Sequence, residues 1–181
     1  YEEAADSQKV VALLEKLRKC LGELPVLFTF RSSREGGEAA LSDGAYQSLN
    51  EAAIASGFVD CVDVELFSGD AVVKAVVAAA HSNNVKVIAS NHDFEKTPAA
   101  EELLARLQKM EAFGADIPKI AVMPQSSKDV LTLLTVTESW KETGKTPVIT
   151  MSMAGEGLIS RLCGEIFGSA VTFGAAGKSS A

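Results

Sequence analysis

The 181-residue sequence predicts an α/β protein built on a parallel sheet, and three observations support this class. Short apolar runs alternate along the chain with longer stretches of helical periodicity. Strands separated by helices must pair in parallel, because only a long crossover connection reaches a parallel neighbour. Several strands carry bulky apolar residues on one face and polar or small residues on the other. A partly polar inner face favours a (β/α)8 TIM-type barrel over an open doubly wound sheet, whose two faces are both covered by helices.

The chain is expected to begin with a helix over residues 3–21, where apolar residues recur at three- and four-residue spacing before Gly22 ends it. Pro25 then opens a strand over residues 25–31, in which valine and phenylalanine side chains share one face and Arg31 lies on the other.

The same two periodicities place the remaining elements in order. In the second strand, Asp63 and Glu65 lie opposite three apolar residues, and in the last, Val171 and Phe173 lie opposite small residues. The expected strands are 59–67, 85–90, 117–123, 147–153 and 169–174, and the expected helices are near 44–56, 69–83, 98–113, 126–143 and 156–166. Only six of the eight strands that close such a barrel are therefore expected.

Composition narrows the possible partners. The formal net charge is -7, with 17 Lys and Arg against 24 Asp and Glu, and no basic cluster interrupts this balance, so nucleic acid and anionic membranes are unfavourable partners. Three widely spaced cysteines predict reduced thiols, and there is no apolar run of roughly 18 residues and no signal peptide. We expect a soluble, cytoplasmic protein with one domain over residues 1–181.

The sequence offers no cofactor motif. No strand is followed by the glycine spacing of a dinucleotide site or of a phosphate-binding loop. Only two histidines are present, and the cysteines are not placed to complete a zinc site with them. His81 ends a helix, where a structural role is expected, whereas His92 follows the third strand, at the barrel face where sites are built. We expect neither a metal nor an organic cofactor.

Lys119 stands out inside an apolar strand, on the same face as Ala121 and Met123. A lysine in a dry interior favours its neutral amine, which is a nucleophile for carbonyl carbons. The alternative is a lysine that extends to water at the bottom of the barrel. Lys86 begins its strand and is expected to be exposed there.

Charged residues near strand ends complete the candidate set. Glu35, Asp63 or Glu65 could orient a basic histidine, and an equally ordinary interpretation pairs Asp63 or Glu65 with Arg31 in a buried ion pair. Arg31 and Arg161 could instead bind an anionic substrate. Gathered at one barrel mouth, these groups would provide a Schiff-base lysine, a proton-shuttling histidine and an anion site.

Several longer stretches are more specific, and in order along nearly the whole chain they resemble type I 3-dehydroquinate dehydratase. They are Phe28-Thr-Phe-Arg-Ser32 with Glu35-Gly-Gly-Glu38, Asp63-Val-Glu-Leu-Phe67, Ser90-Asn-His-Asp-Phe94, Ile117-Pro-Lys-Ile-Ala-Val-Met-Pro124, Thr150-Met-Ser-Met153 and Ile159-Ser-Arg161 with Phe173-Gly174. The resemblance implies a (β/α)8 barrel that removes water from 3-dehydroquinate to give 3-dehydroshikimate in the shikimate pathway, without a cofactor.

The resemblance also implies residue roles. Lys119 would form an imine with the substrate ketone, and His92 would remove the adjacent proton and then protonate the departing hydroxyl. Glu35 would pair with His92. The remaining matched residues would contact the substrate or join the same polar network: Arg31, Asp63, Met153, Arg161 and Ser180. Members of the family are often dimers, so a homodimer is possible.

The chain departs from the family at both ends. A Glu-Trp-Arg-Val-Asp strand would precede Tyr1, and the pattern Ser-Ala-Pro-Gly-Gln and a final helix would follow the last strand, whereas Ser180 and Ala181 match only its first two letters. We therefore expect a barrel truncated at both ends, without its first two strands and last helix. The alternatives are an inactive fragment of this enzyme and another Schiff-base lyase, such as a class I aldolase.

Overall fold

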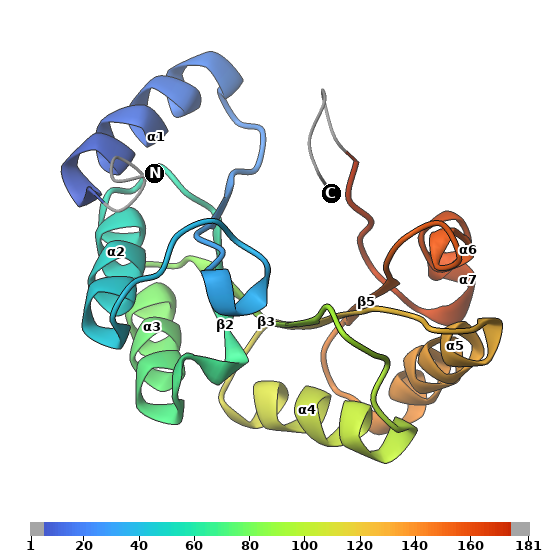
Figure 1. Ribbon diagram of the computed structural model, residues 1–181. Coiled ribbons are helices and arrows are strands. Elements are labelled where there is room, and N and C mark those ends of the chain that lie inside the picture. Colours follow the sequence, from blue (N-terminus) through green and yellow to red (C-terminus); the bar gives the residue numbers. More distant parts are fainter. Residues whose placement is uncertain (1–5, 175–181) are drawn as a thin grey trace.

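The computed structural model describes residues 6–174, which form one curved layer of five parallel strands with helices on its outer side (Figure 1). The strands follow the order of the sequence and are β1 (Leu27–Thr29), β2 (Cys61–Glu65), β3 (Lys86–Asp93), β4 (Ile117–Val122) and β5 (Ile149–Ser152). A doubly wound sheet reverses its strand order at a switch point, and this sheet does not. The expected barrel-type winding is therefore confirmed, in an incomplete barrel that is open between α1 and the C-terminal segment in Figure 1.

Helices connect the strands. They are α1 (Ser7–Leu21), α2 (Asp43–Ala55), α3 (Asp70–Ser82), α4 (Ala100–Ala112), α5 (Ser127–Thr143), α6 (Leu158–Leu162) and α7 (Gly164–Phe167), with 3-10 turns η2 (Ser33–Glu35) and η3 (Leu66–Ser68). Side-chain caps define three of the starts: Asp6 accepts hydrogen bonds from the first turn of α1, Ser42 accepts one from Ala45 at α2, and Ser126 forms a capping box with Asp129 at α5. Between residues 6 and 174, no helix has the length and apolar character to cross a membrane.

Alternation along the strands produces two different buried faces. Val62 and Val64 point outward into a hydrophobic core that they share with residues of α2 and α3. Asp63 and Glu65, the intervening residues, are equally buried on the inner face. The inner face is thus polar while the outer face is apolar, as the sequence pattern predicts.

The expected sixth strand, residues 169–174, does not form. Its contact with the sheet is an isolated parallel bridge between Ser169 and Val148, and residues 170–174 are exposed. The Ser169 side chain explains this, because its Oγ accepts a hydrogen bond from the backbone N–H of Thr150 (3.1 Å) and donates one to the backbone oxygen of Thr150 (3.3 Å). A side chain therefore satisfies the groups to which a sixth strand would have bonded.

Two smaller expectations also change. The helix expected over residues 156–166 is split at Cys163 into α6 and α7. His92 lies within β3 rather than after it, because β3 stays in register with β4 up to the pair of Asp93 and Val122. Residues 3–5 of the expected first helix lie outside the described residues.

Candidate active site

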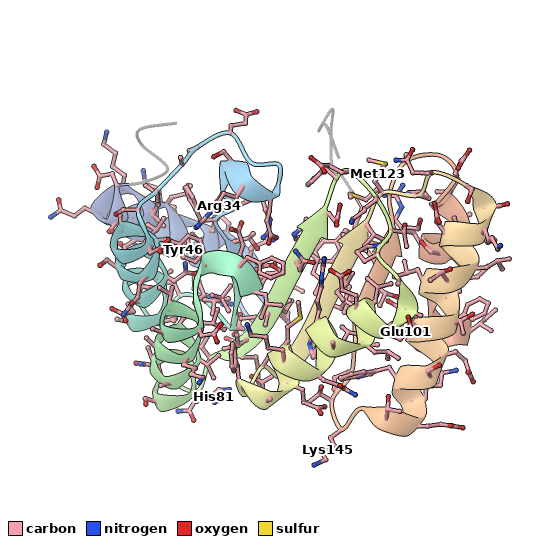
Figure 2. All side chains as sticks on the ribbon, turned by 60° about the horizontal axis from the view of Figure 1, so that its bottom comes forward. Arg34, Tyr46, His81, Glu101, Met123 and Lys145 are labelled. Carbon is pink, nitrogen blue, oxygen red and sulfur yellow. The ribbon has the colours of Figure 1, made fainter. Side chains whose placement is uncertain are left out.

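Five of the predicted site residues meet on the inner face of the sheet, toward the carboxyl ends of the strands: Arg31, Glu35, Asp63, His92 and Lys119. Glu65, Ser90 and Lys119 pair in register across β2, β3 and β4, so their side chains form a row on one face. Figure 2 shows the polarity of the layer: Met123, just after β4, lies at the upper end of the strands, and His81 and Lys145 lie at the lower end.

Arg31 lies at the centre of the acidic residues. Its guanidinium donates hydrogen bonds to Asp63 (Nη2 to Oδ1, 2.9 Å) and to Glu65 (Nη1 to Oε1, 3.0 Å), and it forms a longer ion pair with Glu35 (3.5 Å). Both partners proposed for a buried ion pair, Asp63 and Glu65, are therefore used. Burial alone would lower the pKa of Arg31, but the carboxylates of Asp63, Glu65 and Glu35 outweigh it and raise this pKa. Arg31 is a fixed cation that holds three carboxylates together.

Glu35, on η2, forms the predicted pair with His92. One carboxylate oxygen, Oε2, accepts hydrogen bonds from both the ring Nδ1 and the backbone N–H of His92, each at 2.9 Å. The other, Oε1, accepts one from the amide of Asn91 (3.3 Å). Because a carboxylate at Nδ1 favours the proton there, the lone pair of His92 is at Nε2, where it can act as a base.

The surroundings of His92 keep the ring neutral. Burial lowers the pKa of His92, and the cations Arg31 and Lys119 lower it further, while Glu35 opposes them. At neutral pH the imidazole is therefore present in its basic form.

Lys119 is buried on β4 with 6% of its surface exposed, which excludes the alternative of a lysine that extends to water at the barrel bottom. Its Nζ lies 3.7 Å from Oδ2 of Asp63 and 4.5 Å from the centre of the Phe173 ring. Burial lowers the pKa of Lys119, and Arg31 adds to this effect while Asp63 opposes it. The position therefore favours a nucleophilic amine.

Asp63 lies between Arg31 and Lys119. Its Oδ1 accepts hydrogen bonds from Arg31 and from the hydroxyl of Ser90 (2.6 Å), while its Oδ2 has no hydrogen-bond partner among the described residues and faces Lys119. Burial by itself would raise the pKa of Asp63, but Arg31 and Lys119 hold it below its ordinary value. Asp63 is thus a permanent anion beside the lysine.

The remaining predicted residues are less closely tied to this cluster. Met153 follows β5, and its backbone N–H bonds to Val122 (2.8 Å), which places it at the carboxyl end of the sheet. Arg161, on α6, lines a cavity of about 510 Å³, and its buried Nε has no partner among the described residues. No described interaction joins Arg161 to Lys119 or His92. Ser180 lies outside the described residues.

Lys86 and His81, which were expected to lie away from the site, are at the opposite end of the strands. Lys86 is exposed, as expected, and its Nζ bonds to Asp116 (2.8 Å). His81 bonds to the same carboxylate (2.9 Å), in agreement with a structural role.

Some residues of the cluster were not singled out from the sequence. Ser90 and Asn91 belong to the stretch that resembles the family, but only the three-dimensional arrangement shows that they bond to Asp63 and Glu35. Ser32 bonds to Glu65 through both its N–H and its hydroxyl. Across residues 6–174, no group of histidine, cysteine and acidic side chains is arranged to bind a metal ion.

The chain is similar to known proteins over its whole length. The sequence model of the family described as type I 3-dehydroquinase matches residues 1–181. A 3-dehydroquinate dehydratase from Listeria monocytogenes serotype 4b is 59% identical over 181 residues, and one from Escherichia coli O139:H28 is 59% identical over 182; each match covers 100% of this chain and 72% of the relative.

A solved structure agrees with these matches. The crystal structure of a type I 3-dehydroquinate dehydratase from Clostridium difficile, with covalently modified comenic acid, superposes with a TM-score of 0.96 at 54% identity. That alignment also covers 100% of this chain and 72% of the other chain.

Proposed function

The chain belongs to the type I 3-dehydroquinase family, and we propose on this basis that its Lys119 and His92 carry out the dehydration of 3-dehydroquinate. The observation that carries the assignment is that a buried lysine amine and a carboxylate-held histidine share one polar face at the carboxyl ends of neighbouring strands. An aldolase would need the same lysine but not the pair of Glu35 and His92.

The reaction begins at Lys119. Its neutral amine attacks the ketone carbon of 3-dehydroquinate to give a carbinolamine. Uptake of one proton from solvent by the carbinolamine hydroxyl, followed by its departure as water, gives a protonated imine. The low pKa that burial confers on Lys119 supports this step, because it increases the fraction of free amine. Asp63, at 3.7 Å, is positioned to stabilise the positive charge of the imine nitrogen.

His92 then transfers protons. Its Nε2 removes a proton from the carbon next to the imine, and the electron pair of the C–H bond forms an enamine. The enamine expels the hydroxyl group from the following carbon, and His92 returns its proton so that the hydroxyl leaves as water. Hydrolysis of the conjugated imine releases 3-dehydroshikimate and regenerates Lys119.

The other matched residues would complete the substrate site. We assign Arg161 to the substrate carboxylate, Met153 to an apolar contact over the ring, and Arg31 to the polyol side, where its fixed charge also organises the carboxylates. Ser180 is assigned to the same site. Together residues 1–181 would contribute one catalytic domain.

Turnover tests the assignment directly. The native enzyme should convert 3-dehydroquinate to its conjugated enone, and Lys119→Ala should abolish this conversion. Lys86→Ala is the matched control, since Lys86 is exposed at the opposite end of the neighbouring strand and should leave kcat unchanged. Normal turnover by Lys119→Ala would contradict the proposal.

A further inference from the structure

We propose that Glu65 is a positioning residue for the Glu35–His92 pair and acts on it through Ser32. This inference rests on the proposed function, because it assigns a role within the proton transfer by His92. The four residues form a continuous series of direct hydrogen bonds, from the end of β2 through the turn η2 to β3. Glu65 itself has no described hydrogen bond or ion pair with His92 or Lys119.

The series begins at Glu65, the last residue of β2, which is 1% exposed. Its Oε1 accepts a hydrogen bond from the backbone N–H of Ser32 (2.7 Å), and its Oε2 accepts one from the hydroxyl of Ser32 (2.6 Å). A carboxylate that accepts two short hydrogen bonds from one residue fixes both its position and its orientation.

Ser32 then holds the turn that carries Glu35. It occupies the N-cap position of η2, yet its side chain makes no capping hydrogen bond, because its hydroxyl is directed to Glu65. Its backbone oxygen accepts hydrogen bonds from the N–H groups of Glu35 (3.0 Å) and Gly37 (2.8 Å). Ser32 therefore connects Glu65 to the turn, which the bridge between Ser32 and Ala39 also supports.

Glu35 completes the series, since its carboxylate holds both the ring and the backbone of His92 at 2.9 Å. A general base must lie within hydrogen-bond reach of the proton that it removes. A displacement of Ser32 would move Glu35, and hence the imidazole, away from that position.

Glu65 is fixed from behind. Its backbone N–H bonds to the hydroxyl of Tyr46 on α2 (3.0 Å), and Tyr46 is fully buried and makes a T-shaped ring contact with Phe30. Burial raises the pKa of Tyr46, so the phenol is neutral at working pH. The end of β2 is therefore a buried anchor for the turn η2.

A different role would be neutralisation of Arg31, to which Glu65 also bonds. Three variants separate these roles. Glu65→Gln removes the charge but keeps an acceptor for the N–H of Ser32 and a donor for its hydroxyl, which can reverse its direction. Glu65→Ala removes both contacts. Ser32→Ala removes only the hydroxyl contact and leaves Arg31 untouched.

Buried serine provides a matched control. Ser68 is 1% exposed, compared with 2% for Ser32, and lies three residues after Glu65, but its hydroxyl has no hydrogen-bond partner among the described residues. Ser68→Ala should leave kcat and thermal stability close to the wild-type values. Any general cost of losing a buried hydroxyl is thereby measured separately.

The experiment combines kcat with borohydride trapping during turnover in the native enzyme. Glu65→Ala should lower kcat by about 100-fold, because small displacements of a catalytic group have effects of this size. Ser32→Ala should lower kcat by about tenfold and Glu65→Gln by only about threefold, as fewer contacts are lost. In these variants, mass spectrometry of the trapped Lys119 should show a larger share of the substrate adduct than in the wild type. The product adduct is identified because it is lighter by one water.

The adduct ratio distinguishes positioning from loss of fold, because fewer folded molecules would reduce both adducts equally. Wild-type kcat in Ser32→Ala and Glu65→Ala, or lower activity with an unchanged adduct ratio, would overturn the proposal. So would equal losses in Glu65→Gln and Glu65→Ala, since charge would then be the cause. If Glu65→Ala does not fold, Ser32→Ala and Glu65→Gln decide. A wild-type enzyme without any Lys119 adduct would instead refute the proposed function.

Discussion

Replacing Glu35 by glutamine removes the negative charge that lies beside the imidazole of His92, while it keeps an acceptor for the Nδ1–H of the ring. The carboxylate of Glu35 is 5% exposed, so solvent screens its interaction with His92 only weakly. Glu35 is also the group whose hydrogen bond raises the pKa of His92 against the effect of burial. The substitution thus tests whether this contact supports the general base.

The expected magnitude follows from the hydrogen bond. A hydrogen bond to a charged group makes a net contribution of about 1.5–3 kcal/mol. A change of about 1.4 kcal/mol in the activation free energy corresponds to a factor of ten in rate. If this interaction stabilises the imidazolium formed in the transition state, Glu35→Gln lowers kcat by about 10- to 150-fold.

The pH dependence gives the sign. The basic form of His92 is neutral, so kcat/KM falls as the pH falls through the pKa of His92. Without Glu35, burial and the cations Arg31 and Lys119 act unopposed by the strongest contact that raises this pKa, and it falls further. The acidic limb of the profile should therefore move to lower pH while the plateau falls.

Steady-state kinetics across pH, with Glu38→Gln as control, measure both effects. Glu38 is exposed and lies three residues along the same loop, so its substitution should change neither the limb nor the plateau. An acidic limb that moves to higher pH in Glu35→Gln, or a plateau equal to that of the wild type, would refute the reasoning.

Two further predictions concern stability. Arg31→Met leaves three buried carboxylates without their shared cation and should lower the free energy of unfolding by about 3–5 kcal/mol at pH 7. Arg31 holds the pKa of Asp63 low, so its contribution to stability is lost as the pH falls through that pKa. Urea unfolding should therefore show a smaller difference between variant and wild type in acid. A pH-independent difference would contradict this. Gly37→Ala should destabilise the protein by about 2 kcal/mol or more, because a Cβ would lie 1.9 Å from the backbone oxygen of Arg31. Gly44→Ala, at a helical position of α2 with open space around it, should stabilise the protein by about 0.5–1 kcal/mol. Equal shifts of the thermal unfolding temperature in the two variants would refute the steric argument.

Local patterns predicted much of the fold because they depend on neighbours in sequence. Apolar and polar residues alternate in β2, and this placed Asp63 and Glu65 on the inner face, where both are buried. The exposed position of Lys86 was expected because this residue begins β3. The sixth strand failed because the Ser169 side chain bonds to the backbone of Thr150, a tertiary contact that strand propensity does not contain.

The site was predictable as a set of residues but not as a network. From the sequence, we expected Asp63 or Glu65 to pair with Arg31, and the guanidinium bonds to both. The role proposed for Ser32 depends on its contact with Glu65, which joins the segment after β1 to the end of β2. These two residues are 33 positions apart in the sequence. Such contacts leave no periodic signal, because they arise only when parallel strands bring distant segments into register.

The central claim is that Lys119 forms the imine, and borohydride reduction in the presence of 3-dehydroquinate tests it most directly. Peptide mapping of the reduced native enzyme should place the added mass on Lys119, with Lys86 unmodified as the exposed control on the neighbouring strand. Lys119→Ala should acquire no such mass. An adduct on another lysine, or complete retention of activity after borohydride treatment with substrate, would contradict the account.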